Sequence, residues 1–135
     1  MPIDVLPGAK SDLKALKVSD PDAMAAIVAF LEEADADPKL IDKCTTHGAV
    51  VIGSVSVNVK GWVEARREIG NLWRIRFLDD PKTSRYRMIY GYDWHTRRVG
   101  ILAVVPRSKE TYEIPSVLAD RIQADWERAT DGRST

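Results

Sequence analysis

Arginines occur at alternate positions in two stretches of the chain that are typical of β-strands. Residues 72–77 alternate apolar and basic side chains, which places Arg74 and Arg76 on one face of a strand. The next predicted strand carries Arg85 and Arg87, again two residues apart. The planar guanidinium group pairs with phosphate oxygens through two parallel hydrogen bonds and stays charged at neutral pH. If the two strands are neighbours, this spacing predicts a phosphate-binding surface.

Further basic and phenolic side chains follow a third predicted strand, residues 98–105. These are Arg107, Lys109 and Tyr112. The whole chain has a formal net charge of zero, yet residues 60–112 hold twelve basic and six acidic side chains between acidic flanks. Local fields decide where a polyanion binds, so this basic region is the candidate site. The alternative is that these cations are solvated side chains at strand ends.

The histidines and the single cysteine do not form a recognisable catalytic or metal-binding motif. Cys44 and His47 have metal-capable side chains, but no second pair lies near them in the sequence, and Cys44 is expected to be a small buried residue. His95 falls in a predicted turn after the second strand of the basic region. We therefore predict no metal and no cofactor.

The elements that must position these residues follow a simple order. A short strand near residues 3–7 precedes two helices, and the sequence Ser19-Asp20-Pro21 is a start signal for the second of them. A three-strand meander and a helix over residues 113–129 end the chain. The fold class is predicted as α+β, with a small antiparallel sheet made of the N-terminal strand and the meander, an N-terminal helical hairpin and a C-terminal helix.

The length of 135 residues and an apolar content of 44% indicate one globular domain spanning the whole chain. Residues 49–70 are β-rich but ambiguous, and are predicted to be an insertion or an extended arm. The chain starts without the basic and apolar stretches of a secretory signal, and its apolar runs are too short for a membrane span. We expect a cytoplasmic protein that does not bind membranes.

Two stretches of the chain resemble the RelE/ParE superfamily of bacterial toxins, in particular its RelE- and HigB-like ribonucleases. Residues 3–41 match in the order of their elements. Residues 72–126 match in sequence, through a basic-x-basic strand, a Tyr-Arg-x-x-Tyr strand from Tyr86 to Tyr90, and an Arg-to-Tyr segment before the last helix. The three motifs together are moderately specific, whereas each alone is weak.

The resemblance implies roles for individual residues. The two basic residues of the first meander strand, Arg74 and Arg76, correspond to RNA phosphate contacts. Arg85 and Lys109 are further phosphate-binding candidates because of their positions in the predicted strand pattern, and not because of the resemblance. Arg87 corresponds to the residue that binds the scissile phosphate. Arg107 corresponds to an acid or transition-state stabiliser, and Tyr112 to a residue that stacks on a base and helps to activate the 2′-hydroxyl.

The function implied is that of a metal-independent endoribonuclease that cleaves mRNA on the ribosome and inhibits translation. Attack of a ribose 2′-hydroxyl on the adjacent phosphate develops negative charge, which clustered guanidinium groups stabilise. The expected partners are mRNA, the ribosome and a cognate antitoxin protein. The alternative is a non-enzymatic member of the same fold: a ParE-like gyrase inhibitor or a degenerate phage- or cassette-borne binding protein.

Overall fold

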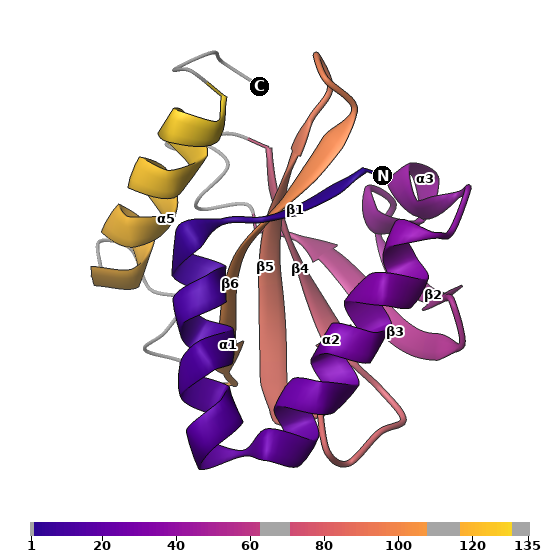
Figure 1. The fold of residues 1–135 in the computed structure, drawn as a ribbon. Coiled ribbons are helices and arrows are strands. Elements are labelled where there is room, and N and C mark those ends of the chain that lie inside the picture. The colour runs from indigo at the N-terminus through magenta and orange to yellow at the C-terminus, as the bar shows by residue number, and fades with distance from the viewer. Residues whose placement is uncertain (1, 63–70, 108–116, 131–135) are drawn as a thin grey trace.

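The computed structural model describes residues 2–62, 71–107 and 117–130. Within these residues the chain forms six strands and four helices around one sheet (Figure 1). In chain order they are β1 (Ile3–Val5), α1 (Pro7–Ser19), α2 (Pro21–Asp35), α3 (Leu40–Cys44), β2 (Gly48–Ile52), β3 (Val55–Gly61), β4 (Leu72–Phe77), β5 (Tyr86–Asp93), β6 (Arg98–Pro106) and α5 (Val117–Ala129). The predicted α+β class is confirmed.

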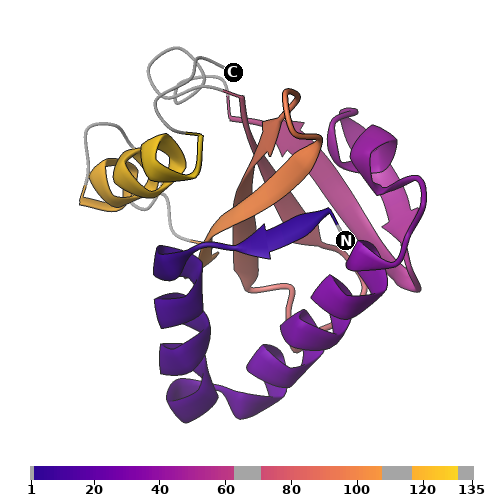
Figure 2. The ribbon, with the colours of Figure 1, turned by 45° about the horizontal axis from the view of Figure 1, so that its top comes forward.

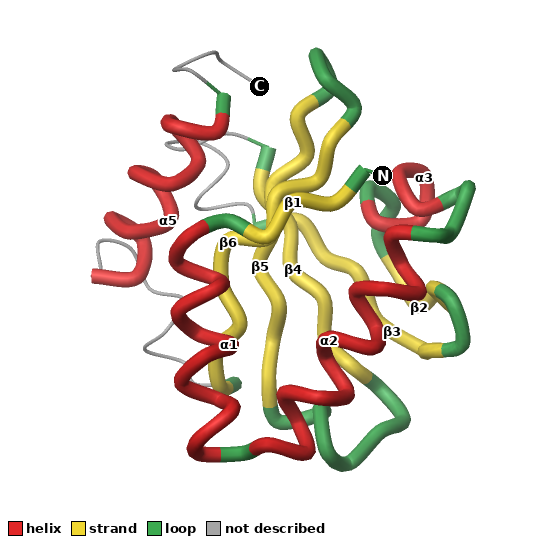
Figure 3. The backbone as a smooth tube through the Cα atoms, in the orientation of Figure 1, coloured by secondary structure: helices red, strands yellow, loops and turns green. Residues whose placement is uncertain are grey.

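The sheet differs from the prediction in strand number and in one pairing direction. Its order is β1-β6-β5-β4-β3-β2, and Figure 3 shows these strands as one continuous layer. The sheet was expected to be wholly antiparallel, but β1 runs parallel to β6, with Ile3 opposite Val99. A short hairpin turn forces antiparallel pairing, whereas β1 and β6 are far apart in sequence and nothing forces their directions to oppose. The sheet is therefore mixed.

Part of the ambiguous segment 49–70 belongs to the sheet. β2 and β3 form an antiparallel hairpin, and β3 pairs antiparallel with β4 from Val57 opposite Phe77 to Gly61 opposite Trp73. The alternating valines of β3 supply the apolar face that the sheet needs, since Val57 and Val59 are buried. This hairpin places two more strands beside the meander.

The predicted start of the second helix is confirmed at α2. The Asp20 side chain accepts a hydrogen bond from the amide of Ala23 at 3.3 Å, and Pro21 occupies the first turn. The Tyr86 hydroxyl, on β5, donates to the same carboxylate at 2.8 Å. One aspartate thus caps α2 and ties it to the sheet.

Helices cover both faces of the sheet (Figure 2). On one face, α1, α2 and α3 pack on a large apolar core in which Phe30 and Phe77 meet edge to face, with ring centroids 5.2 Å apart. On the other face, α5 packs through Ile122 and Trp126 on a smaller core that includes Leu102 and Ala103 of β6. These two cores position every strand that carries the predicted site.

Two polar contacts hold α5 against α1. Arg121 forms a bidentate ion pair with Asp12, at 2.8 and 2.9 Å, and the same carboxylate accepts from the amide of Val104. The amide of Gly8 donates to Asp125 at 2.9 Å. These contacts place α5 along β6.

Candidate functional site

The apolar residues of β4 decide the direction of its arginines. Trp73, Ile75 and Phe77 are buried in the core beneath α1, α2 and α3. Successive side chains in a strand point to opposite faces, so Arg74 and Arg76 lie on the face that also carries α5. The prediction that these two arginines share one face of the strand is confirmed.

The register of the sheet brings basic side chains from three strands together. Arg76 lies opposite Arg87 of β5 on one side and opposite Asn58 of β3 on the other. Two residues along β4, Arg74 lies opposite Lys60 of β3. The site therefore consists of two rows across the sheet, one of Asn58, Arg76 and Arg87 and one of Lys60 and Arg74.

These five residues line a hollow of about 140 Å³, here called the basic hollow. Four of the five carry a positive charge, and the described lining contains no carboxylate. Concave surfaces lined by one sign of charge raise the local concentration of the opposite ion. The basic hollow thus has the charge and the hydrogen-bond donors to hold phosphate groups.

Three side chains of the basic hollow are available for a ligand. Asn58, Lys60 and Arg76 form no side-chain hydrogen bond or ion pair with any residue that the structure describes. Lys60 and Arg76 are also solvent-exposed. A phosphate that entered the hollow would reach donors from two adjacent strands, β3 and β4, without breaking a contact between these three side chains and any described residue.

The other predicted site residues do not join this group in the described part of the chain. Arg85 lies 3.8 Å from Asp20 and its guanidinium carbon lies 6.0 Å from the ring centroid of Tyr86, so its side chain extends toward the start of α2. Arg107 is exposed just beyond β6, and its Nη1 donates to the Ser84 carbonyl at 3.5 Å. Neither residue lines the basic hollow. Lys109 and Tyr112 lie outside the described residues.

Asn58 and Lys60 were missed as site residues. The signal was present, because both sit at the positions that alternate with the valines of residues 55–59, and so share the face opposite the buried side chains. What the sequence lacks is the identity of the neighbouring strand. Only the pairing of β3 with β4 brings Lys60 beside Arg74.

Both histidines make contacts away from the basic hollow. The amide of Gly61 donates to Nε2 of His47 at 3.0 Å, and the His47 ring packs near Trp73 with centroids 5.0 Å apart. His95 stacks on the exposed Trp94 at the tip of the β5–β6 hairpin, with centroids 3.9 Å apart. Neither ring lines the hollow.

The cysteine is buried in the larger core. Burial raises the pKa of the Cys44 thiol to about 12, and the Tyr90 hydroxyl donates to the Cys44 carbonyl at 2.6 Å. Across the described residues, no group of three or more His, Cys, Asp or Glu side chains has an arrangement suited to a metal ion. Cys44 is thus part of the packing.

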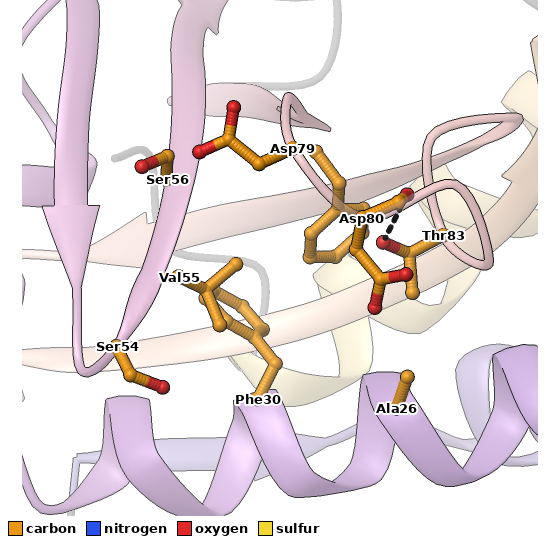
Figure 4. Close-up of a pocket in the computed structure, with 9 residues that line it drawn as sticks. Ala26, Phe30, Ser54, Val55, Ser56, Asp79, Asp80 and Thr83 are labelled. Atoms are coloured by element: carbon orange, nitrogen blue, oxygen red, sulfur yellow. Dashed lines mark hydrogen bonds between the residues drawn. The ribbon is translucent and has the colours of Figure 1, made fainter.

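A larger cavity, of about 250 Å³, lies on the α2 face of the sheet (Figure 4). Its charged lining residues are Asp79 and Asp80, and the Asp80 carboxylate accepts from the amide of Lys82 at 2.9 Å. The remaining lining residues are Ala26, Phe30, Ser54, Val55, Ser56, Phe77 and Thr83. Two carboxylates repel phosphate, so the smaller basic hollow is the better candidate for a polyanion.

No protein-family model, curated protein or solved structure matches the chain. The resemblance to the RelE/ParE toxins therefore stays a prediction. In the part of the chain that the structure describes, no helix combines the length and apolarity needed to cross a membrane.

Proposed function

We propose that this chain is a RelE-like toxin that binds mRNA at the basic hollow and cleaves it, on the ribosome, without a metal or other cofactor. The single observation that carries the proposal is the convergence of Arg74, Arg76 and Arg87 from two adjacent strands on one concave surface. Guanidinium groups held on rigid strands are preorganised for phosphate oxygens. We further propose that the protein acts in the cytoplasm.

The reaction proposed is an internal phosphoryl transfer. The ribose O2′ loses its proton and attacks the adjacent phosphorus, the bond from phosphorus to O5′ breaks, and O5′ takes up a proton. The products are a 2′,3′-cyclic phosphate and a free 5′-hydroxyl. Arg87 and Arg76, opposite each other in the sheet, would stabilise the extra charge on the phosphorane. Arg107 and Tyr112 are the proposed proton-transfer residues, on the family resemblance alone.

One observation favours a second function, that of a non-enzymatic binding protein on the same fold. The described lining of the basic hollow consists of four cations and an amide, with no histidine or carboxylate to accept the 2′-hydroxyl proton. Histidine and carboxylates are the commonest general bases. A protein with this hollow and no base would bind a polyanion or an acidic partner without cleaving it, as a ParE-like gyrase inhibitor or a degenerate phage- or cassette-borne binding protein.

A cleavage assay on translated mRNA separates the two functions. Arg87→Ala removes a guanidinium from the β5 side of the basic hollow and should slow cleavage by about a hundredfold or more, the effect of losing one transition-state donor. Lys17→Ala is the matched control, because Lys17 is exposed on α1, away from the hollow. Absence of cleavage by the folded wild-type protein would favour the non-enzymatic function. Equal cleavage rates for Arg87→Ala and Lys17→Ala, with both folded by circular dichroism, would show that Arg87 does not act in catalysis.

The proposed protein partner is a small acidic antitoxin encoded beside this gene, which would bury the basic hollow or displace α5. Its association should slow as salt rises, because the attraction to the hollow is screened. Charge reversal at Arg74 and Arg76 together should weaken the complex. An association rate indifferent to both changes would mean that the antitoxin binds elsewhere.

A further inference from the structure

Strand β3 contributes two hydrogen-bond donors to the basic hollow, Asn58 and Lys60, that lie outside the three motifs of the meander. Lys60 lies directly opposite Arg74, and Asn58 lies directly opposite Arg76. Both line the hollow, and neither is engaged by a described residue. Neighbouring strands are about 4.8 Å apart, so side chains from opposed positions reach the same small anion.

The two rows are separated along the strands by two residues, which corresponds to roughly 7 Å. The distance between neighbouring phosphates of an extended single-stranded nucleic acid is similar. A nucleic acid that lies along β4 would place one phosphate at Arg76 and Arg87 and the next at Lys60 and Arg74. The amide of Asn58 would donate a neutral hydrogen bond at the first position.

The geometry points to a second phosphate subsite, formed by Lys60 with Arg74, through which the β2–β3 hairpin binds the nucleotide next to the cleavage position. This inference rests on the proposed function for the identity of the ligand, single-stranded RNA, but concerns a different pair of residues. In this arrangement Lys60 is a binding residue that positions the RNA, whereas Arg87 contacts the phosphate that reacts.

The test measures binding separately from cleavage. The probe is a fluorescein-labelled single-stranded deoxyoligonucleotide of about eight nucleotides, which lacks the 2′-hydroxyl and therefore cannot be cleaved by the proposed reaction. Fluorescence anisotropy gives the affinity at several salt concentrations. For single strands, each neutralised phosphate contributes about 0.7 to the slope of the logarithm of the binding constant against the logarithm of salt concentration.

Lys60→Gln should weaken binding several-fold at low salt and reduce this slope by about 0.7, since one ion contact is lost. Lys17→Gln removes the same charge from α1 and should leave the slope unchanged. Asn58→Asp places a carboxylate beside Arg76 and should weaken binding more than Ser11→Asp, which adds the same charge on the exposed surface of α1. Equal slopes for Lys60→Gln and Lys17→Gln would overturn the subsite.

The outcome for the subsite is distinguishable from the outcome for the ribonuclease. If the wild-type protein binds the probe with the expected dependence on Lys60 but cleaves no RNA, the second subsite stands and the ribonuclease proposal fails. If the protein cleaves RNA and Lys60→Gln leaves both affinity and slope unchanged, the subsite alone is wrong. Absence of any binding of the probe by the wild-type protein would also overturn the subsite.

Discussion

Gly91 of β5 offers a test of how α5 is held on the sheet. The Trp126 ring of α5 lies directly over this glycine, and its indole is 3% exposed. A Cβ atom added at Gly91 would lie 2.7 Å from Cη2 and Cζ2 of Trp126 and 2.8 Å from Cζ3. Three ring atoms would be overlapped at once, and the ring is buried, so a small rotation cannot relieve the contact. Gly91→Ala should therefore push α5 away from β5.

Two effects of opposite sign determine the stability of this variant. Alanine in place of glycine restricts the unfolded chain and should stabilise a strand residue by about 0.5–1 kcal/mol. Overpacking a buried contact costs about 1–3 kcal/mol. The overpacking term is larger, so we expect Gly91→Ala to lower the free energy of unfolding by about 1–2 kcal/mol.

The physical cause is isolated by a double-mutant cycle with Trp126→Leu, in which the ring that causes the overlap is absent. Urea unfolding followed by far-ultraviolet circular dichroism gives the free energy of unfolding for all four proteins. In the Trp126→Leu background, Gly91→Ala should become neutral or stabilising by up to about 1 kcal/mol. Equal destabilisation of both backgrounds by Gly91→Ala would show that the packing of Trp126 on Gly91 does not control how α5 is held on the sheet.

Two further predictions concern groups whose pKa values the fold shifts. The hydrogen bond from the Tyr86 hydroxyl lowers the pKa of Asp20 from its ordinary 3.8, aided by the Ala23 amide, so its ionised form stabilises the fold. Above pH 3.8, Asp20→Asn should lower the melting temperature by a constant amount, and by less as the pH falls through the lowered pKa of Asp20. A difference in melting temperature between wild type and variant that grows in acid would contradict this. Cys44, with its pKa raised to about 12, should react with a disulfide reagent at pH 8 only when urea unfolds the chain. Rapid labelling of the native protein would show that the thiol is accessible.

The local patterns of the sequence predicted several elements correctly, because they depend on neighbours in the chain. The alternation over residues 72–77 predicted a strand with Arg74 and Arg76 on one face, and burial of the intervening side chains confirms it. The pair Asp20 and Pro21 predicted the start of α2, because capping involves atoms within one helical turn. The α+β class followed from the order of these elements.

The pairing of strands was decided only by the tertiary structure. Alternation in residues 55–59 shows which side chains share a face, but the partner strand is set by packing between distant segments. For that reason β1 was wrongly predicted to run antiparallel in the sheet, whereas it pairs parallel with β6. The contribution of Lys60 to the basic hollow was not predicted. Local sequence patterns do not determine strand register, because register depends on contacts across the whole sheet.

Side-chain direction at the ends of strands was likewise a tertiary property. The alternation in the sequence predicted Arg85 and Arg87 at alternate positions of one strand, so they were expected on one surface. In the structure Arg87 lines the basic hollow, whereas Arg85 lies one residue before β5, and its long side chain extends toward Asp20 at the start of α2. The Arg85 guanidinium lies 3.8 Å from the Asp20 carboxylate, and only the folded chain brings that charge within its reach.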